Sequence, residues 1–265
     1  MIGSRPIGAN AVGATYTAPS TGVTELVFDA TAANGGYPPS SISASHALGY
    51  ASGNNRLVLL IASALGGATH TFSSVTYNGV TPTLICQYDC PLVFGRTTSV
   101  AIYMLLDASL PATAGSYTAS FTTDNGYSGR LVVLSFAGAK QATPLYTGIT
   151  AGTGSSLSGT VSSSHEACWS AGGIIDVFAS ESSTTTGNSS TPGSSQTELS
   201  DGYYNTCCIY SSMKEFSGGG GVFAMSQTPA NAYWTYDYVL LGVADYSAVS
   251  CNVAKDNAAI IGAHF

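Results

Sequence analysis

Charged side chains are scarce in this chain of 265 residues, since Asp, Glu, Lys and Arg together make up only 8 % of it. An ordinary soluble domain contains roughly 25 %. The seven Lys and Arg residues are spread singly, and the net charge is −7. Nucleic-acid binding needs clustered cations, so we expect no nucleic-acid partner. Because charge is the usual protection against association, this composition favours a protein that is packed in an assembly.

Long apolar runs are also absent. A membrane helix needs about 20 consecutive apolar residues, whereas the stretch from Leu57 to Leu65 is shorter and contains Ser63. The first residues carry one Arg and lack the apolar core of a secretory signal. We therefore expect no membrane-spanning segment and no signal peptide. Disorder is excluded as well, because 45 % of the residues are hydrophobic.

Helix signals are missing too, because strong helix formers nowhere follow an amphipathic 3.6-residue spacing for three turns. Apolar stretches bounded by Gly, Ser, Asn and Pro recur instead, and they predict an all-β protein. The run Leu57–Ile61 lacks alternation, which predicts a strand that is covered on both faces. Asn78-Gly79 predicts a type I′ hairpin turn. The strands expected to be most buried are residues 55–63, 98–106, 129–137, 172–180 and 235–244.

Several segments occur in an order that resembles a known family. They are Asn55-Arg56-Leu57-Val58-Leu59-Leu60, Ser74-Val75-Thr76-Tyr77-Asn78-Gly79, Ala101-Ile102-Tyr103-Met104-Leu105-Leu106, Gly115-Ser116-Tyr117-Thr118 and Leu131-Val132-Val133-Leu134-Ser135-Phe136-Ala137-Gly138. In this order they resemble a jelly-roll β-sandwich family that is common in phage virion proteins and bacterial surface proteins. The resemblance covers residues 20–246, and Cys86 and Cys90 depart from the family pattern.

The resemblance implies an antiparallel, jelly-roll-type β-sandwich with an extended N-terminal arm. It also implies a bacteriophage virion structural protein on the particle surface, either a capsid decoration (cement) protein or a neck- or tail-associated one. The expected partners are other virion proteins, such as the major capsid or neck and tail proteins, and further copies of the chain in a homo-oligomer such as a trimer. No catalytic residue comes with the family.

The expected organisation has three parts: an arm over residues 1–19, a single sandwich domain over 20–250 and a tail over 251–265. Residues 2–13 are similar to the starts of phage structural proteins. Ordering such a Gly-rich arm costs about 1–2 kcal/mol per residue, and its aliphatic side chains return at most about 1.5–3 kcal/mol each. We therefore expect the arm to order by docking on a neighbour. The arm residues that would contact it are Ile2, Arg5, Ile7 and Val12.

Cysteines are few, and in a virion or secreted protein they favour disulfides over buried thiols. The candidates are Cys86, Cys90, Cys168, Cys207, Cys208 and Cys251. Sequence alone does not choose among the 15 pairings that six cysteines allow. Neighbouring residues on a strand point to opposite faces, so Cys207 and Cys208 should have different surroundings.

No catalytic, metal or cofactor site emerges. There is no nucleophile elbow, and the grouping of Cys86 and Cys90 with His165 and Cys168 has a weak zinc-ligand spacing. We therefore expect no enzyme, no metal and no cofactor. Hydroxylated aromatics suit protein interfaces and sugar stacking, and they cluster at Tyr203, Tyr204, Tyr233 and Trp234. The alternative function is accordingly a receptor- or carbohydrate-binding module, with a host glycan as its ligand.

Overall fold

We analysed a computed structural model of the protein. It describes residues 22–37, 41–90, 95–124, 126–141, 150–157, 160–167, 169–217 and 221–246, with the backbone alone at 150–157 and 165–167. The expected arm (1–19) and tail (251–265) therefore lie outside the described residues, as do the expected domain limits at residues 20 and 250. Those limits stay a prediction.

The N-terminal half of the chain forms a sandwich of two antiparallel sheets. A five-stranded sheet has the order β1-β8-β3-β6-β5, and a three-stranded sheet has the order β2-β7-β4. The only helical turn in the described part of this half is a short 3-10 turn, Asp107–Ser109. The strands are β1 (Val27–Gly36), β2 (Ile42–Leu48), β3 (Leu57–Gly66), β4 (Phe72–Tyr77), β5 (Thr83–Asp89), β6 (Thr97–Leu106), β7 (Gly115–Thr123) and β8 (Ser128–Ala137).

The C-terminal half repeats this arrangement. Its five-stranded sheet has the order β9-β16-β11-β14-β13, and its three-stranded sheet has the order β10-β15-β12. Adding eight to each strand number of the first half gives the order of the second, so the protein contains two copies of one topology. The strands are β9 (Thr150–Leu157), β10 (Val161–Ala167), β11 (Ala171–Ser182), β12 (Ser190–Pro192), β13 (Thr197–Tyr204), β14 (Cys207–Ser217), β15 (Gly221–Pro229) and β16 (Tyr233–Ala244).

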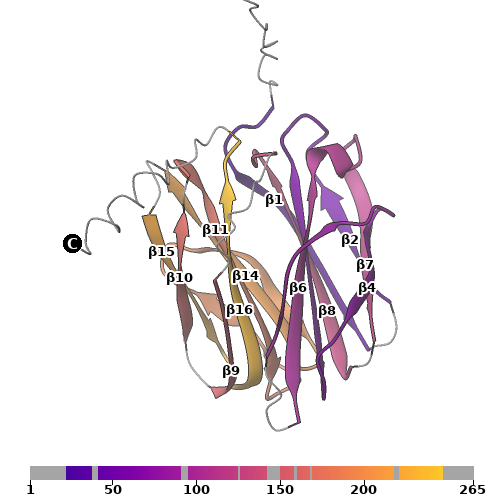
Figure 1. Ribbon diagram of the computed structural model, residues 1–265, viewed down its shortest axis with the longest axis vertical. Coiled ribbons are helices and arrows are strands. Elements are labelled where there is room, and N and C mark those ends of the chain that lie inside the picture. The colour runs from indigo at the N-terminus through magenta and orange to yellow at the C-terminus, as the bar shows by residue number, and fades with distance from the viewer. Residues whose placement is uncertain are drawn as a thin grey trace, which may run out of the picture.

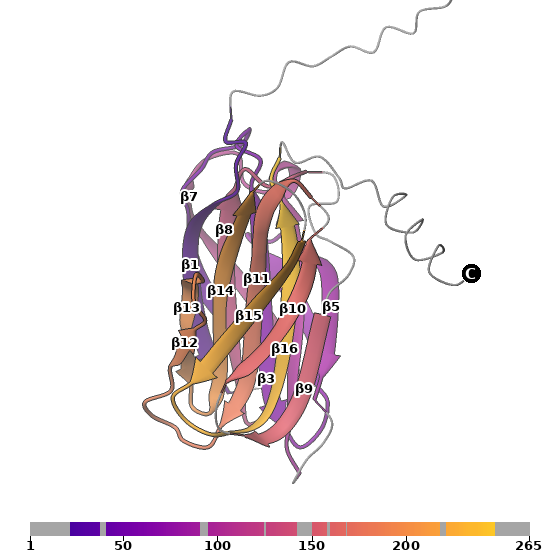
Figure 2. The same ribbon diagram turned by 90° about the vertical axis from the view of Figure 1, so that its left-hand side faces the viewer.

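The two sandwiches lie side by side, with their five-stranded sheets facing each other (Figure 1). Seen across the molecule in Figure 1, the layers run from β10 and β15, through the two large sheets, to β2, β7 and β4. Three apolar cores fill the gaps, one inside each sandwich and the third between the two large sheets. The turned view in Figure 2 shows β11, β14 and β16 behind β10 and β15.

This layering explains the uninterrupted apolar strand in the sequence. Leu59 and Ile61 of β3 point into the core between the sandwiches. Leu60 and Ala62, which alternate with them, point into the core of the N-terminal sandwich. Every residue of β3 is buried, because a strand in a middle layer is covered on both faces. The prediction that this run is a doubly covered strand is confirmed.

The packing between the halves is reciprocal. β6 packs on β16 and β11, and the equivalent strand of the second half, β14, packs on β8 and β3. A contact in which i touches j and j touches i is the mark of two-fold packing. The two halves therefore sit together like the subunits of a symmetric dimer that has been joined into one chain.

All five predicted buried strands are confirmed as β3, β6, β8, β11 and β16. The all-β, antiparallel class is also confirmed for the described residues. The duplication, with its four layers in place of the two layers of a single sandwich, was not expected from the sequence.

The turn at Asn78-Gly79 is confirmed, but its hairpin ends early. Asn78 and Gly79 both have positive φ, 50° and 78°, as a type I′ turn requires. Only Tyr77 and Val80 pair beside it. β4 then joins β7 of the small sheet, while β5 joins β6 of the large one. The turn therefore carries the chain from one sheet to the other.

The expected disulfides are not found, because none of the cysteines that the structure describes, at 86, 90, 207 and 208, is disulfide-bonded. Cys207 lies against Ser63 of the facing sandwich, with its Sγ 3.8 Å from Ser63 Oγ. Cys208 points the other way, into the core of the C-terminal sandwich. The two side chains have different surroundings, as predicted. Both are buried free thiols, so the pair contributes to packing and not to a disulfide. Cys168 and Cys251 lie outside the described residues.

Candidate functional site

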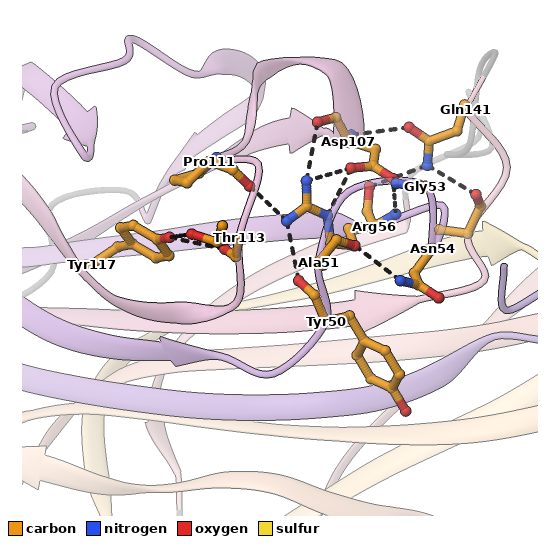
Figure 3. A network of polar contacts seen from close by, with 11 residues as sticks. Tyr50, Ala51, Gly53, Asn54, Arg56, Asp107, Pro111, Thr113, Tyr117 and Gln141 are labelled. Atoms are coloured by element: carbon orange, nitrogen blue, oxygen red, sulfur yellow. Dashed lines mark hydrogen bonds and ion pairs between the residues drawn. The ribbon is translucent and has the colours of Figure 1, made fainter.

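A buried arginine organises the end of the molecule at which the first described strand begins and the last one ends. Arg56 has no exposed surface. Its Nε donates to Asp107 Oδ1 at 2.7 Å, and its Nη1 donates to the carbonyls of Tyr50 and Pro111 at 3.1 and 2.8 Å. Figure 3 shows these bonds converging on one guanidinium. Arg56 thereby ties the loop before β3 to the loop after β6.

Gln141 adds a third loop to this network. Its Oε1 accepts from the backbone N–H of Asp107 at 3.0 Å, and its Nε2 donates to the carbonyls of Arg56 and Ala139 (Figure 3). Gly53 N–H donates to the second oxygen of Asp107 at 3.0 Å. Burial of a charge is tolerated only when it is paired and hydrogen-bonded, and this network supplies both conditions. The sequence contained the arginine in the Asn55-Arg56-Leu57 segment, but nothing in the sequence indicated Asp107 or Gln141.

The two ends of the described chain meet at this site. Asn55 Nδ2 donates to the Val23 carbonyl at 2.8 Å, and the Leu26 N–H donates to Asp245 Oδ1 at 3.0 Å. The Tyr246 N–H donates to the Gly138 carbonyl at 2.6 Å. Residues 22–26 and 245–246 are therefore held against both sandwiches. We call this region, with the Arg56 network, the exit end.

An open pocket of about 490 Å³ lies at the exit end between the two sandwiches. Leu26 and Phe216 line it together with three carboxylates, from Glu25, Glu215 and Asp245. Burial raises the pKa of Asp245, and the nearby Glu25 and Glu215 raise it further, against the opposing bond from Leu26. The described lining is thus apolar and negatively charged.

The opposite end carries exposed aromatics. Trp234 lies at a bulge in β16, where the pairing with β11 shifts register, and 37 % of its surface is exposed. The Arg96 guanidinium lies 5.6 Å from the centre of the Trp234 ring and forms an ion pair with the buried Glu181. Tyr127, on a neighbouring loop, is 61 % exposed. Bulges commonly re-aim a side chain near a binding site.

A buried carboxylate sits inside the C-terminal sandwich. Asp176 accepts from the Ser212 N–H and hydroxyl at 2.6 and 2.7 Å, from the Tyr238 hydroxyl at 3.0 Å, and from the side-chain amides of Gln227 and Gln196. Burial raises the pKa of Asp176 to about 6, although these bonds oppose the rise. Asp176 has no exposed surface, so we assign the network to stability.

The predicted aromatic residues do not form one patch. Tyr204 packs against Tyr37 after β1, with ring centres 5.3 Å apart. Tyr203 lies on the opposite face of β13 and is 37 % exposed. Tyr233 is buried in the core of the C-terminal sandwich, and Trp234 is the exposed residue described above. Their expected interface role stays a prediction.

The predicted arm residues Ile2, Arg5, Ile7 and Val12 lie outside the described part of the chain. Among the described residues, no group of three or more His, Cys, Asp or Glu could hold a metal ion. The described part also contains no helix that is long and apolar enough to cross a membrane.

Comparison with family models, with curated proteins and with solved structures finds no match to this chain. Its function must therefore be argued from its own residues.

Proposed function

We propose that this chain is a structural protein of a bacteriophage virion, a capsid decoration or neck- or tail-associated protein that stabilises the particle, and that each half is a jelly roll. The observation that carries this proposal is the strand order. In each half the first strand pairs with the eighth and the second with the seventh, around a central third strand. Jelly rolls of eight strands are frequent in viral capsid proteins and lectins.

The sequence and the central packing support the same proposal. The middle layers are apolar on both faces, so the two sandwiches form a rigid block, and the chain has few charges to keep such blocks apart. Such a block suits a particle component that must keep its shape.

The exit end supports a role for the arm. Asn55, next to Arg56, holds Val23 at the start of the described chain, and a pocket lined by carboxylates lies at the same end. In a homo-oligomer, this end of one copy offers negative charge to Arg5 of another copy. The proposed partners are therefore other virion proteins together with further copies of this chain.

The test is an assembly assay with particles that have been stripped of accessory proteins. Full-length protein should bind them, and a variant lacking residues 1–13 should fold but bind poorly. Arg5→Glu should weaken binding more than the matched Arg5→Lys. Undiminished binding of the truncated protein would show that the arm has no docking role, and failure of the full-length protein to bind would contradict the proposal itself.

A second candidate is a receptor- or carbohydrate-binding module, and Trp234 is the observation that favours it. A partly exposed indole beside the Arg96 guanidinium resembles the aromatic surfaces on which sugar rings stack. A glycan array with the wild type and Trp234→Ala separates the two functions. Binding that is lost in Trp234→Ala but kept in Tyr203→Ala would favour this candidate.

A further inference from the structure

A fully buried carboxyl group of one sandwich lies within electrostatic range of a carboxyl group of the other, at the end opposite the exit end. Asp237 lies on β16 of the C-terminal sandwich and has no exposed surface. Asp89 ends β5 of the N-terminal sandwich, and its charge acts on Asp237. Neither oxygen of Asp237, nor the buried Oδ1 of Asp89, has a hydrogen-bond partner among the described residues.

Asp176 provides the contrast. Both Asp176 and Asp237 are fully buried, but the carboxylate of Asp176 accepts hydrogen bonds from Ser212, Gln227, Tyr238 and Gln196. A buried carboxylate without donors bears the full cost of desolvation, and it avoids that cost by taking up a proton. The two sites therefore differ in the species that the fold accommodates, a carboxylate at Asp176 and a neutral carboxyl at Asp237.

The other ionisable side chains near Asp237 do not stabilise its charged form. Glu181 lies on the neighbouring strand β11, two pairing positions away, and it already pairs with Arg96, which directly precedes β6. The backbone N–H of Cys90, after β5, opposes the rise in the pKa of Asp237, but it also donates to the Thr98 carbonyl at 2.8 Å. Tyr236 is adjacent in the chain, and burial, then Cys90 and the Asp237 charge, raise the pKa of its hydroxyl.

We propose that the two sandwiches are held closed at this end only while Asp237 is neutral, so that the junction between them is a pH-sensitive switch. Loss of the proton places a second charge near Asp89, where no described side chain donates to either oxygen of Asp237. The adjacent cross-junction contacts, Thr98 with Thr235 at 2.5 Å and Cys207 with Ser63, would then separate.

The direction of the effect follows from the pKa. Burial and the charge of Asp89 raise the pKa of Asp237 to about 8, above its value in the unfolded chain, although the Cys90 backbone N–H opposes the rise. The contribution of this group to stability is therefore complete below about pH 4 and is lost as the pH rises through 8. Between pH 7 and pH 9 the loss is about tenfold in the unfolding equilibrium constant. That corresponds to a fall in Tm of roughly 3–5 °C.

The first measurement is Tm from pH 5 to pH 10 for the wild type and three variants. Asp237→Asn keeps the shape and stays neutral, so it should remove the fall between pH 7 and pH 9. Asp89→Asn should move the fall to lower pH and make it smaller. Asp176→Asn, the matched control at a buried carboxylate within one sandwich, should keep the fall whatever its own Tm. An equal fall in wild type and Asp237→Asn would overturn the proposal.

The second measurement reports on the junction in the native state. Cys207 lies between the sandwiches and Cys208 inside one of them, so the rate of Cys207 labelling by a small thiol reagent, relative to Cys208, follows opening. At pH 9 this ratio should be several-fold higher in the wild type than in Asp237→Asn. Equal ratios would contradict the switch. If calcium chloride instead restores the wild-type Tm at pH 9 and a chelator reverses the effect, the two carboxyl groups bind a cation. That result would also overturn the proposed switch.

Discussion

Replacement of Arg56 tests the exit end most sharply. Arg56→Met keeps much of the side-chain volume but removes the charge and every donor of the guanidinium. The substitution leaves Asp107, the Tyr50 carbonyl and the Pro111 carbonyl without their partner. Removal of one member of a buried ion pair costs about 3–5 kcal/mol, and we expect a loss of that size in the free energy of unfolding.

The assay is urea unfolding at pH 7, followed by intrinsic fluorescence. Asp107→Asn and the double variant complete a thermodynamic cycle, because residues within one network are coupled by about 0.5–3 kcal/mol. Asn54→Ala is the matched control, since it removes only the hydrogen bond from the Asn54 side chain to the Ala51 carbonyl. A cost below about 1 kcal/mol for Arg56→Met would refute the reasoning, because it would mean that water replaces the guanidinium at this end.

Three further predictions follow from the packing and the buried groups. Ile61→Ala should lower the free energy of unfolding by about 2–5 kcal/mol. The control Val27→Ala, at an exposed side chain, should change it by less than about 0.5 kcal/mol. Equal changes for the two variants in urea titrations would contradict the packing of the three cores. Burial raises the pKa of Asp176 to about 6, so its contribution to stability is lost as the pH rises through 6, and Asp176→Asn should make the fall in Tm between pH 5 and pH 7 smaller, leaving the part that Asp237 causes. Mass spectrometry of unreduced, unfolded protein should find Cys207 and Cys208 alkylated as thiols, and a disulfide at either residue would refute their assignment to packing.

The sequence predicted those features of the fold that depend on local pattern. The run Leu57–Ile61 predicted a doubly covered strand because it lacks alternation, and Asn78-Gly79 predicted its turn because both residues tolerate positive φ. Neighbouring Cys207 and Cys208 were expected on opposite faces for the same kind of local reason. In each case the information lies within a few residues.

The rest depends on contacts between residues far apart in the chain. The duplication left no visible repeat, because equivalent strands such as β3 (LVLLIASALG) and β11 (AGGIIDVFASES) share a place in the fold but few residues. Asp107 and Gln141 are ordinary polar residues until the fold brings them to Arg56. Asp89 and Asp237 are 148 positions apart, and only the stacking of the sandwiches makes them neighbours.

For the cysteines that the structure describes, the disulfide expectation was wrong for a physical reason. It rested on the cellular compartment that the composition suggested, whereas the stacked sheets already bury Cys207 and Cys208 completely. A buried thiol acts as a small apolar side chain, and burial raises the pKa of both thiols, to about 12 and about 11. Raised thiol pKa values suppress the thiolate that forms disulfides.

The most direct test of the proposed function is the composition of purified virus particles. Particles from the source of this sequence would be banded on a density gradient and analysed by quantitative mass spectrometry. The account predicts peptides from residues 22–246 in a fixed ratio to those of the major capsid protein, band after band. Absence of these peptides from intact particles, with the chain recovered only from the soluble fraction, would contradict a virion role.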